Sequence, residues 1–323
     1  MRFKFLDFIT RLAPYTKKEF LVFDLGKGFI KILAMRDSQI EDFFIKKNEP
    51  DSFRLAIEWL KKEKLEDVDV YLVVKGEGVL LRYIPFPKVE KEKIKEVFNY
   101  EIARFIPFKK EEVYFDVCVL EENYSKEEFF ILLAVVKKDF INSIIEKFKK
   151  EDINIVRIIP NNVALINLYL NFFLKEERNI ALVDIGVSST LLSLVKGKIP
   201  CLSREIKVSL SDLFERIFKK ENIEKDKIID EEERFKGIME DFGWELSQEI
   251  KNSFDYFEIN WGQKIEKIFL TGGGAKFKTL FEVLKNSLGL EVEIMDPLKK
   301  IKHYPSQLLN FKEILATSIG ASI

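Results

Sequence analysis

The pattern Asp-x-Gly occurs twice in this chain, each time at the end of an apolar run that predicts a β-strand. The first copy begins at Asp24 and the second at Asp184, and a third turn, residues 272–274, is Gly-Gly-Gly after another apolar run. Glycine lets a backbone come close to a ligand, so such turns can present N–H groups to phosphate oxygens. The two aspartates supply the oxygen ligands that Mg²⁺ prefers. One Asp-x-Gly alone is an ordinary turn, but three turns in this order predict a nucleotide site.

Composition limits the class of protein. The chain has 323 residues, enough for two domains, and 47% of them are hydrophobic, which favours folded cores over disorder. Its 53 basic and 54 acidic residues give a net charge of -1, so it lacks the basic excess of a nucleic-acid binder. Charged residues, mostly Lys and Glu, make up 33% of the chain, a composition typical of thermophile proteins with ion-paired surfaces and also of proteins from AT-rich genomes, which favour Lys, Phe and Ile.

The sequence offers little for metal or nucleophile chemistry outside the turns. Cys118 and Cys201 are far apart, so they predict free thiols in a reducing cytosol and no zinc site. His303 is the only histidine, which argues against a Ser-His-Asp triad. The most apolar stretch, 153–174, is interrupted by polar residues, so we expect no membrane span. The basic and apolar segment 1–12 predicts either a loose tail or a peripheral membrane contact.

The periodicity of apolar residues predicts an α/β protein made of two similar halves, residues 1–178 and 179–323. Each half reads strand, turn, strand, strand, helix, with Asp-x-Gly in the first turn, and this repetition predicts a duplication with a cleft between the halves. Residues 79–159 predict a compact α+β module inserted in the first half. In that module Ile94, Phe98, Ile102 and Phe105 recur at helical spacing, which predicts a helix face packed on the module's own sheet.

The layout resembles the actin-like ATPase clan, and within it the chain is similar to the PilM family of type IV pilus assembly proteins. The stretches that carry the resemblance are 82–87 (Arg-Tyr-Ile-Pro-Phe-Pro), 98–108 with its Ile106-Pro107-Phe108 ending, 111–116 and 248–257. The resemblance implies an actin-like ATPase fold with two duplicated domains and a small inserted subdomain. It also implies a cytoplasmic, nucleotide-binding adaptor that is associated with the inner membrane through its partners. These would be the N-terminal peptide of a PilN-type membrane protein and other pilus assembly proteins.

The family's motifs can be placed on this chain residue by residue. The resemblance implies ATP or ADP with Mg²⁺ as cofactor, and Asp24 and Asp184 as the residues that hold the metal. The nucleotide-binding positions that it implies are Asp24, Gly26, Lys27 and Gly28 in the first turn, Asp184, Gly186, Ser188, Ser189 and Thr190 in the second, Lys236 near the purine, and Gly272, Gly273 and Gly274 at the adenosine.

Two departures from the family pattern predict at most a slow ATPase, with no catalytic residue assigned. The first turn has Lys27 and Gly28 where the family has a hydroxyl, and residues 158–161 lack the acid that precedes the family's proline. Phosphoryl transfer to water depends on positioning and electrostatics, which these losses weaken. The alternatives are an active ATPase or kinase of the same clan, and a cytoplasmic GspL-type domain of a type II secretion system.

Overall fold

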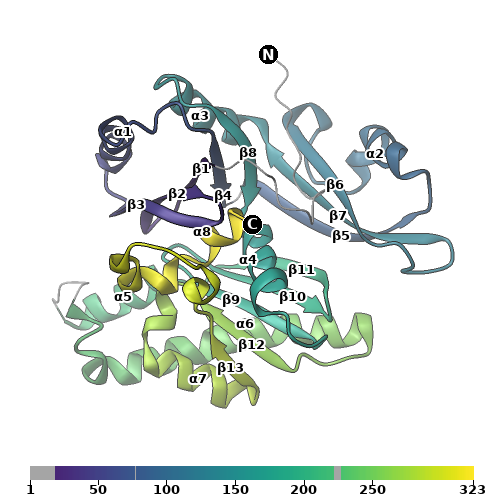
Figure 1. Ribbon diagram of the computed structural model, residues 1–323. Helices are drawn as coiled ribbons and strands as arrows, with labels where there is room; N and C mark the ends of the chain where they lie inside the picture. Colours follow the sequence, from purple (N-terminus) through teal and green to yellow (C-terminus); the bar gives the residue numbers. More distant parts are fainter. Residues whose placement is uncertain (1–18, 77, 222–226) are drawn as a thin grey trace. The chain divides into compact units, whose positions relative to one another are not determined.

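The computed structural model describes residues 19–76, 78–221 and 227–323 (Figure 1). The segment 1–12, with its expected tail or membrane contact, lies outside the described residues. Within the described ranges, no helix is long and apolar enough to cross a membrane.

The chain divides into two compact units. The first unit extends to residue 167 and includes two segments that return from the C-terminal part of the chain, 301–305 and 317–323; the second unit comprises the rest. The sequence analysis placed the division after residue 178 and assigned the whole C-terminal part to the second domain. Returning segments of this kind leave no local pattern in the sequence, because their place is decided by packing.

A five-stranded mixed sheet of order β3-β2-β1-β4-β8 forms the first unit. Three strands form an antiparallel meander, and β4 and β8 continue the sheet parallel to β1. The strands are β1 (Glu19–Leu25), β2 (Phe29–Arg36), β3 (Gln39–Lys47), β4 (Val70–Val74) and β8 (Ile155–Pro160). All of β4 is buried, as expected for a parallel strand that is covered on both faces.

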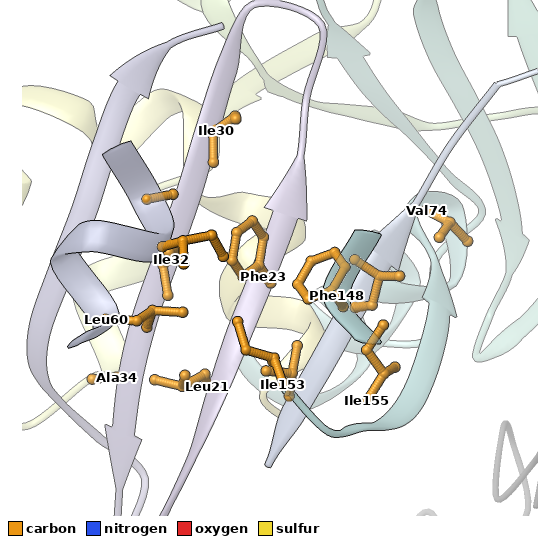
Figure 2. Packing of buried hydrophobic residues seen from close by; sticks show 14 of the residues in the cluster. Leu21, Phe23, Ile30, Ile32, Ala34, Leu60, Val74, Phe148, Ile153 and Ile155 are labelled. Carbon is orange, nitrogen blue, oxygen red and sulfur yellow. The ribbon is translucent and has the colours of Figure 1, made fainter. Parts of the chain in front are cut away.

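Two amphipathic helices complete the core of the first sheet, α1 (Ser52–Lys62) and α3 (Lys138–Lys149). Leu60 of α1 and Phe148 of α3 are fully buried among side chains of the sheet (Figure 2). The ring of Phe148 meets that of Phe23 edge-on, with centroids 4.8 Å apart. Truncating a buried phenylalanine to alanine typically costs about 3–5 kcal/mol, so this contact fixes α3 on the sheet.

The inserted module has an antiparallel sheet of order β5-β7-β6 and one short helix. Its elements are β5 (Val79–Pro87), β6 (Val113–Glu121), β7 (Glu128–Lys137) and α2 (Ile94–Glu101). Ile94, Phe98 and Ile102 are buried in the module's own core, with Phe105 packed beside them. The predicted role of this helix face, packing on the module's own sheet, is therefore confirmed.

The C-terminal end of the module differs from the expectation. The module was expected to extend to residue 159, but its last stretch, residues 155–160, pairs with β4 in the first sheet, as β8. The helix α3 likewise packs in the core of that sheet. The module's own sheet therefore ends with β7, and α3 is the crossover that the parallel strands β4 and β8 require.

The second unit repeats the first sheet, with order β11-β10-β9-β12-β13. Its strands are β9 (Ile180–Ile185), β10 (Thr190–Lys196), β11 (Ile199–Ile206), β12 (Lys267–Thr271) and β13 (Glu291–Ile294). The helices α6 (Lys236–Trp261) and α7 (Lys278–Leu288) run side by side along this sheet (Figure 1). The α-helices not yet given are α4 (Asn161–Leu168), α5 (Leu210–Lys220) and α8 (Ala316–Ala321), and Tyr169–Phe173 forms a π-helical turn. The expected duplication of strand–turn–strand–strand is therefore present.

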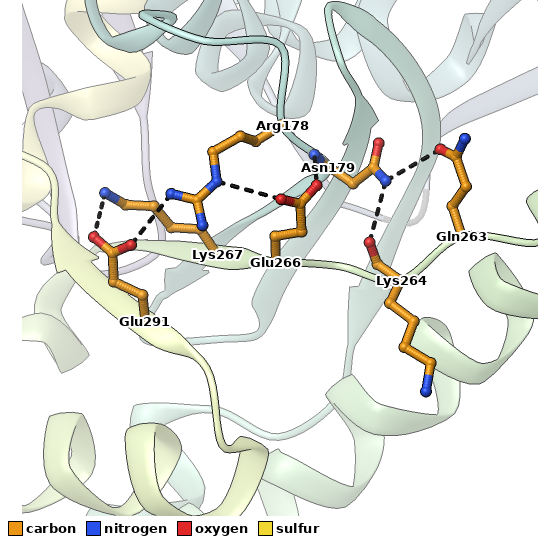
Figure 3. A network of polar contacts seen from close by, with 7 residues as sticks. All are labelled: Arg178, Asn179, Gln263, Lys264, Glu266, Lys267 and Glu291. Atoms are coloured by element: carbon orange, nitrogen blue, oxygen red, sulfur yellow. Dashed lines mark hydrogen bonds and ion pairs between the residues drawn. The ribbon is translucent and has the colours of Figure 1, made fainter.

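A network of polar contacts joins the amino ends of the parallel strands in the second unit (Figure 3). Arg178 contacts Glu266 at 3.4 Å and Glu291 at 3.3 Å, and Lys267 contacts Glu291 at 2.7 Å. Exposed ion pairs contribute about 0–1 kcal/mol each, although a network of several can exceed that. The glycine turns lie at the opposite, carboxyl ends of β9 and β12, where open α/β sheets bind ligands.

Candidate functional site

The first turn joins β1 to β2 and is held by a side chain that the sequence analysis missed. Asn48 donates from its side-chain amide to the carbonyl of Gly26 at 2.8 Å, and from its backbone N–H to that of Gly28 at 2.9 Å. A Cβ at Gly26 would stand 2.6 Å from the carbonyl oxygen of Phe29, so the turn itself requires glycine there. Lys27 is exposed.

Asp24, at the end of β1, is buried in a set of partners. Lys31 Nζ lies 2.6 Å from Asp24 Oδ2, and the hydroxyls of Thr317 and Ser318 donate to the same oxygen at 2.8 and 3.1 Å. Burial raises the pKa of the Asp24 carboxyl, but the charges of Lys31 and Lys75 and the hydrogen bonds outweigh burial, so the pKa lies below its ordinary value of 3.8. Asp24 is therefore an ionised carboxylate in the protein interior, and the ammonium of Lys31 balances its charge.

Two further residues lie at the carboxyl edge of the first sheet, and the sequence analysis assigned neither. Lys75 follows β4, and its Nζ stands 3.7 Å from the position of a Cβ at Gly26. Asn161 follows β8 and is 4% exposed, and its Nδ2 has no hydrogen-bond partner among the described residues. The order of the parallel strands could have indicated both positions, because each residue comes directly after a strand next to or near β1.

The second turn uses two of its three predicted hydroxyls internally. Ser189 donates to Glu205, and Thr190 donates to the carbonyl of Val208 at 2.7 Å. Both residues are buried, whereas Ser188 is exposed. Ser188 is therefore the hydroxyl of this turn that remains accessible to a ligand.

The N-terminus of α5 is also occupied by the second turn. The amide of Leu210 donates to the carbonyl of Gly186, and that of Ser211 to the carbonyl of Val187, each at 3.0 Å. The first N–H groups of a helix are its usual anion-binding donors, and here they hold the turn instead.

The third turn packs directly on the second. Gly272 has φ of +86°, and a Cβ there would overlap Asp184 Oδ1. A Cβ at Gly274 would overlap the side chain of Ile185. The backbone N–H of Gly272 donates to the carbonyl of Glu313 at 2.7 Å. The structure thus brings Asp184 and the Gly-Gly-Gly turn together, and two of these glycines are required by contacts within the protein.

Lys236, the predicted purine neighbour, is the exposed first residue of α6. The sequence analysis did not assign a second residue of this region, Glu232. Glu232, one turn earlier, accepts hydrogen bonds from the backbone N–H groups of Lys278 and Thr279 at the start of α7. A carboxylate at a helix N-terminus is stabilising, so Glu232 ties the segment before α6 to α7.

A family model described as type IV pilus assembly protein PilM matches residues 29–322. The chain belongs to the PilM family. A search of curated protein sequences finds no match.

Solved structures support the fold of this PilM-family chain. The PilM-PilN type IV pilus biogenesis complex contains a chain with a TM-score of 0.83 and 22% identity, covering 94% of this chain and 97% of that one. The ethanolamine utilization protein EutJ from Carboxydothermus hydrogenoformans has a TM-score of 0.52 and 14% identity, covering 96% and 91%. MreB 5 of Spiroplasma citri bound to AMPPNP has a TM-score of 0.51 and 10% identity, covering 95% of each chain. The predicted actin-like ATPase fold is confirmed.

The fold family implies Mg²⁺, so the predicted metal residues can be tested for fit. In the described ranges, no group of three or more His, Cys, Asp or Glu side chains could hold a metal ion. Asp24 does not fit a metal ligand, because an ammonium and two hydroxyls already engage its Oδ2 and it is 3% exposed. Asp184 lies beside Gly272 and is partly exposed, so its carboxylate fits a metal ligand better than that of Asp24 does.

Two other features of the PilM-family chain lie outside the glycine turns. A cavity of about 360 Å³ in the second unit lies beside the Arg178 network, and none of the motif residues line it. The candidate site therefore lies at the glycine turns, whose backbone N–H groups and carboxylates suit a nucleotide. Burial raises the pKa of Cys118 and of Cys201 to about 12, and neither residue forms a disulfide. They are therefore protonated and inert at neutral pH.

Proposed function

We propose that this chain is an adaptor of the type IV pilus inner-membrane assembly complex, acting at the cytoplasmic face and holding the N-terminal peptide of a PilN-type membrane protein. The observation that carries the proposal is the family match over residues 29–322, joined by the likeness to nearly the whole of the chain in the PilM-PilN complex. The family match does not favour the alternatives, an active clan kinase or a GspL-type secretion domain.

The peptide is proposed to bind on the first unit next to the inserted module. The module has its own core and holds none of the glycine turns, so its sheet and helix serve no evident chemistry. Its helix α2 also presents Tyr100, which is 77% exposed and lies under Lys110 Nζ at 5.9 Å. Exposed aromatic side chains of this kind are common anchors of protein interfaces.

Hydrogen exchange of the whole protein, with and without a synthetic PilN-type N-terminal peptide, tests this placement. Amides of β5, β6, β7 and α2 should become protected, while those of α6 around Phe254 should not change. A peptide with the same composition in scrambled order is the control. Protection confined to the turns at Asp184 and Gly273 would place the peptide elsewhere and contradict the proposal.

The adaptor is also proposed to bind ATP or ADP at its glycine turns, with Ser188 and Lys236 as the accessible side chains of the second unit. Binding to the folded state alone raises stability by about 2.7 kcal/mol at a hundredfold excess over Kd, so a thermal shift with millimolar nucleotide tests it. Gly273→Val is the matched variant, because a side chain there meets only the flexible end of Leu210, at 2.9 Å from its Cβ position. The variant should fold and lose the shift.

Turnover of bound nucleotide is proposed to be slow. Residues 158–161 lack the acid that precedes the family's proline, and the amide of Asn161 cannot take a proton from water as a carboxylate does. Steady phosphate release should stay well below ~1 per second, the lower end of ordinary enzyme rates. Release at or above that rate would favour an active ATPase instead.

A further inference from the structure

The carboxyl edge of the first sheet carries more positive charge than its carboxylate can balance. Asp24 is in contact with Lys31 at 2.6 Å, which already gives a neutral pair. Lys75 is a second ammonium at the same edge, close enough to Asp24 for its charge to act on that carboxyl. The described residues give Lys75 no ion pair of its own. These three side chains, one carboxylate and two ammoniums, sum to a charge of +1.

A buried hydrogen-bond donor lies on the same edge. The residues paired at the ends of β4 and β8 are Val74 and Pro160, so Lys75 and Asn161 occupy the next positions on neighbouring parallel strands. The backbone N–H of Asn162 donates to Asn161 Oδ1 at 2.9 Å, which leaves Nδ2 as the amide's donor. This Nδ2 is buried and has no acceptor among the described residues, a costly state that a bound acceptor would relieve.

We propose that an oxyanion of the phosphate class binds at this edge through Lys75 and Asn161 Nδ2, and that it binds without a divalent cation. Lys31 supplies internally the positive charge that a metal would bring to Asp24. A dication next to this neutral pair and the surplus Lys75 would be repelled rather than held. Backbone N–H groups of the Gly26 turn complete the surroundings of the anion. A Cβ placed at Gly26 would stand 3.7 Å from Lys75 Nζ, so the turn and this ammonium lie close together.

This inference deepens the proposed nucleotide binding, since the anion is either the phosphate end of a nucleotide or a free phosphate. Titration calorimetry of the full chain with ADP and, separately, with pyrophosphate distinguishes the two sources. Each ligand is titrated once in EDTA and once with Mg²⁺. We expect the ligand that binds to do so in EDTA, with a Kd that Mg²⁺ does not tighten.

Variants of the two residues test the contacts. Lys75→Met keeps the apolar stem and removes the charge, and should weaken binding in EDTA at least tenfold. Asn161→Ala should weaken it severalfold. Lys62→Met, an exposed lysine at the end of α1, is the matched control and should leave Kd unchanged. Far-ultraviolet circular dichroism and the Tm of each variant confirm folding, and Lys75→Gln serves as a second charge-removing variant.

The outcomes separate this inference from the proposed function. ADP that binds only with Mg²⁺ would overturn the metal-free site and leave nucleotide binding intact. Pyrophosphate that binds in EDTA while ADP does not would support the anion site and contradict the nucleotide. Unchanged Kd in folded Lys75→Met and Lys75→Gln would overturn the assignment of Lys75. Absence of binding by either ligand in both buffers would overturn both proposals.

Discussion

The two hairpins that begin the two sheets share a motif and a topology but differ in one cross-strand residue. In the first hairpin Asp24 is paired in register with Lys31, and in the second Asp184 is paired with Leu191. The lysine neutralises the first aspartate in the interior, whereas the second aspartate stays partly exposed beside Gly272. An Asp-x-Gly motif therefore does not by itself establish a metal ligand, because the facing strand decides the charge that the carboxylate presents.

The hydroxyls of the two turns show a second difference. The first turn has Lys27 and Gly28 and recruits its hydroxyls, Thr317 and Ser318, from the C-terminal helix α8. The second turn carries its own hydroxyls but uses Ser189 and Thr190 for internal bonds, as described above. In both units most of the motif's polar groups hold the fold, and only a few remain for a ligand.

The largest predicted effect comes from making the first hairpin resemble the second. Lys31→Leu removes the ammonium that contacts the buried carboxylate of Asp24, and breaking a buried ion pair in this way typically costs about 3–5 kcal/mol. Urea unfolding at neutral pH measures the loss in free energy of unfolding. Adding Asp24→Asn to this variant should recover part of it, since the uncompensated charge is removed.

The matched control lies at the equivalent position of the second hairpin. Leu191→Met changes one buried apolar side chain for another of similar volume and should cost less than about 1.5 kcal/mol. Equal losses in Lys31→Leu and Leu191→Met would contradict the claim that Lys31 acts as a buried counter-ion.

Much of this comparison could be predicted from the sequence, and the decisive part could not. Apolar periodicity located the strands and helices, and the repeated order predicted the duplicated sheet, because both depend on local patterns. The partners of Asp24 depend on distant packing, since Thr317 is 293 residues away. Lys31 was within reach of prediction, because a hairpin centred on the turn 26–28 places it opposite Asp24. The assignment of β8 to the first sheet likewise needed the parallel pairing with β4.

The second-largest predicted effect is on the pH dependence of stability: Asp24 should lower the free energy of unfolding in acid. Its pKa is lowered in the folded state, so its contribution is complete above the unfolded value near 3.8 and is lost as pH falls below that value. The slope from one such group is at most about 1.4 kcal/mol per pH unit. Unfolding free energies between about pH 3 and pH 6 should therefore fall less steeply in Asp24→Asn than in the unchanged protein. Parallel curves for the two proteins would show that folding does not lower the pKa of Asp24.

The third effect tests the contact between the second and third turns. Gly272→Ala adds a Cβ at a positive φ and against Asp184, and should cost about 1–3 kcal/mol for the backbone strain, plus the overlap. Gly289→Ala is the matched control, because Gly289 also has a positive φ, +65°, but nothing lies within 4 Å of its Cβ position. Thermal unfolding should show the larger loss for Gly272→Ala, because the φ of +86° and ψ of 177° of Gly272 lie in a region open essentially only to glycine and because the Cβ also meets the backbone of Ile185. Equal Tm values would mean that neither the backbone strain nor the overlap at Gly272 costs stability.

The smallest effects separate the structural hydroxyls of the second turn from the accessible one. Thr190→Val keeps the side chain's shape but leaves the carbonyl of Val208 without its donor, so the free energy of unfolding should fall by about 1–2 kcal/mol. Ser188→Ala changes an exposed side chain and should stay within about 0.5 kcal/mol. Nucleotide affinity should show the reverse order, because only Ser188 can reach a ligand: its loss should weaken ADP binding severalfold, while Thr190→Val should bind normally under conditions where it is folded. A pair of variants that affected stability and affinity in the same order would mean that the second turn does not divide its hydroxyls between fold and ligand.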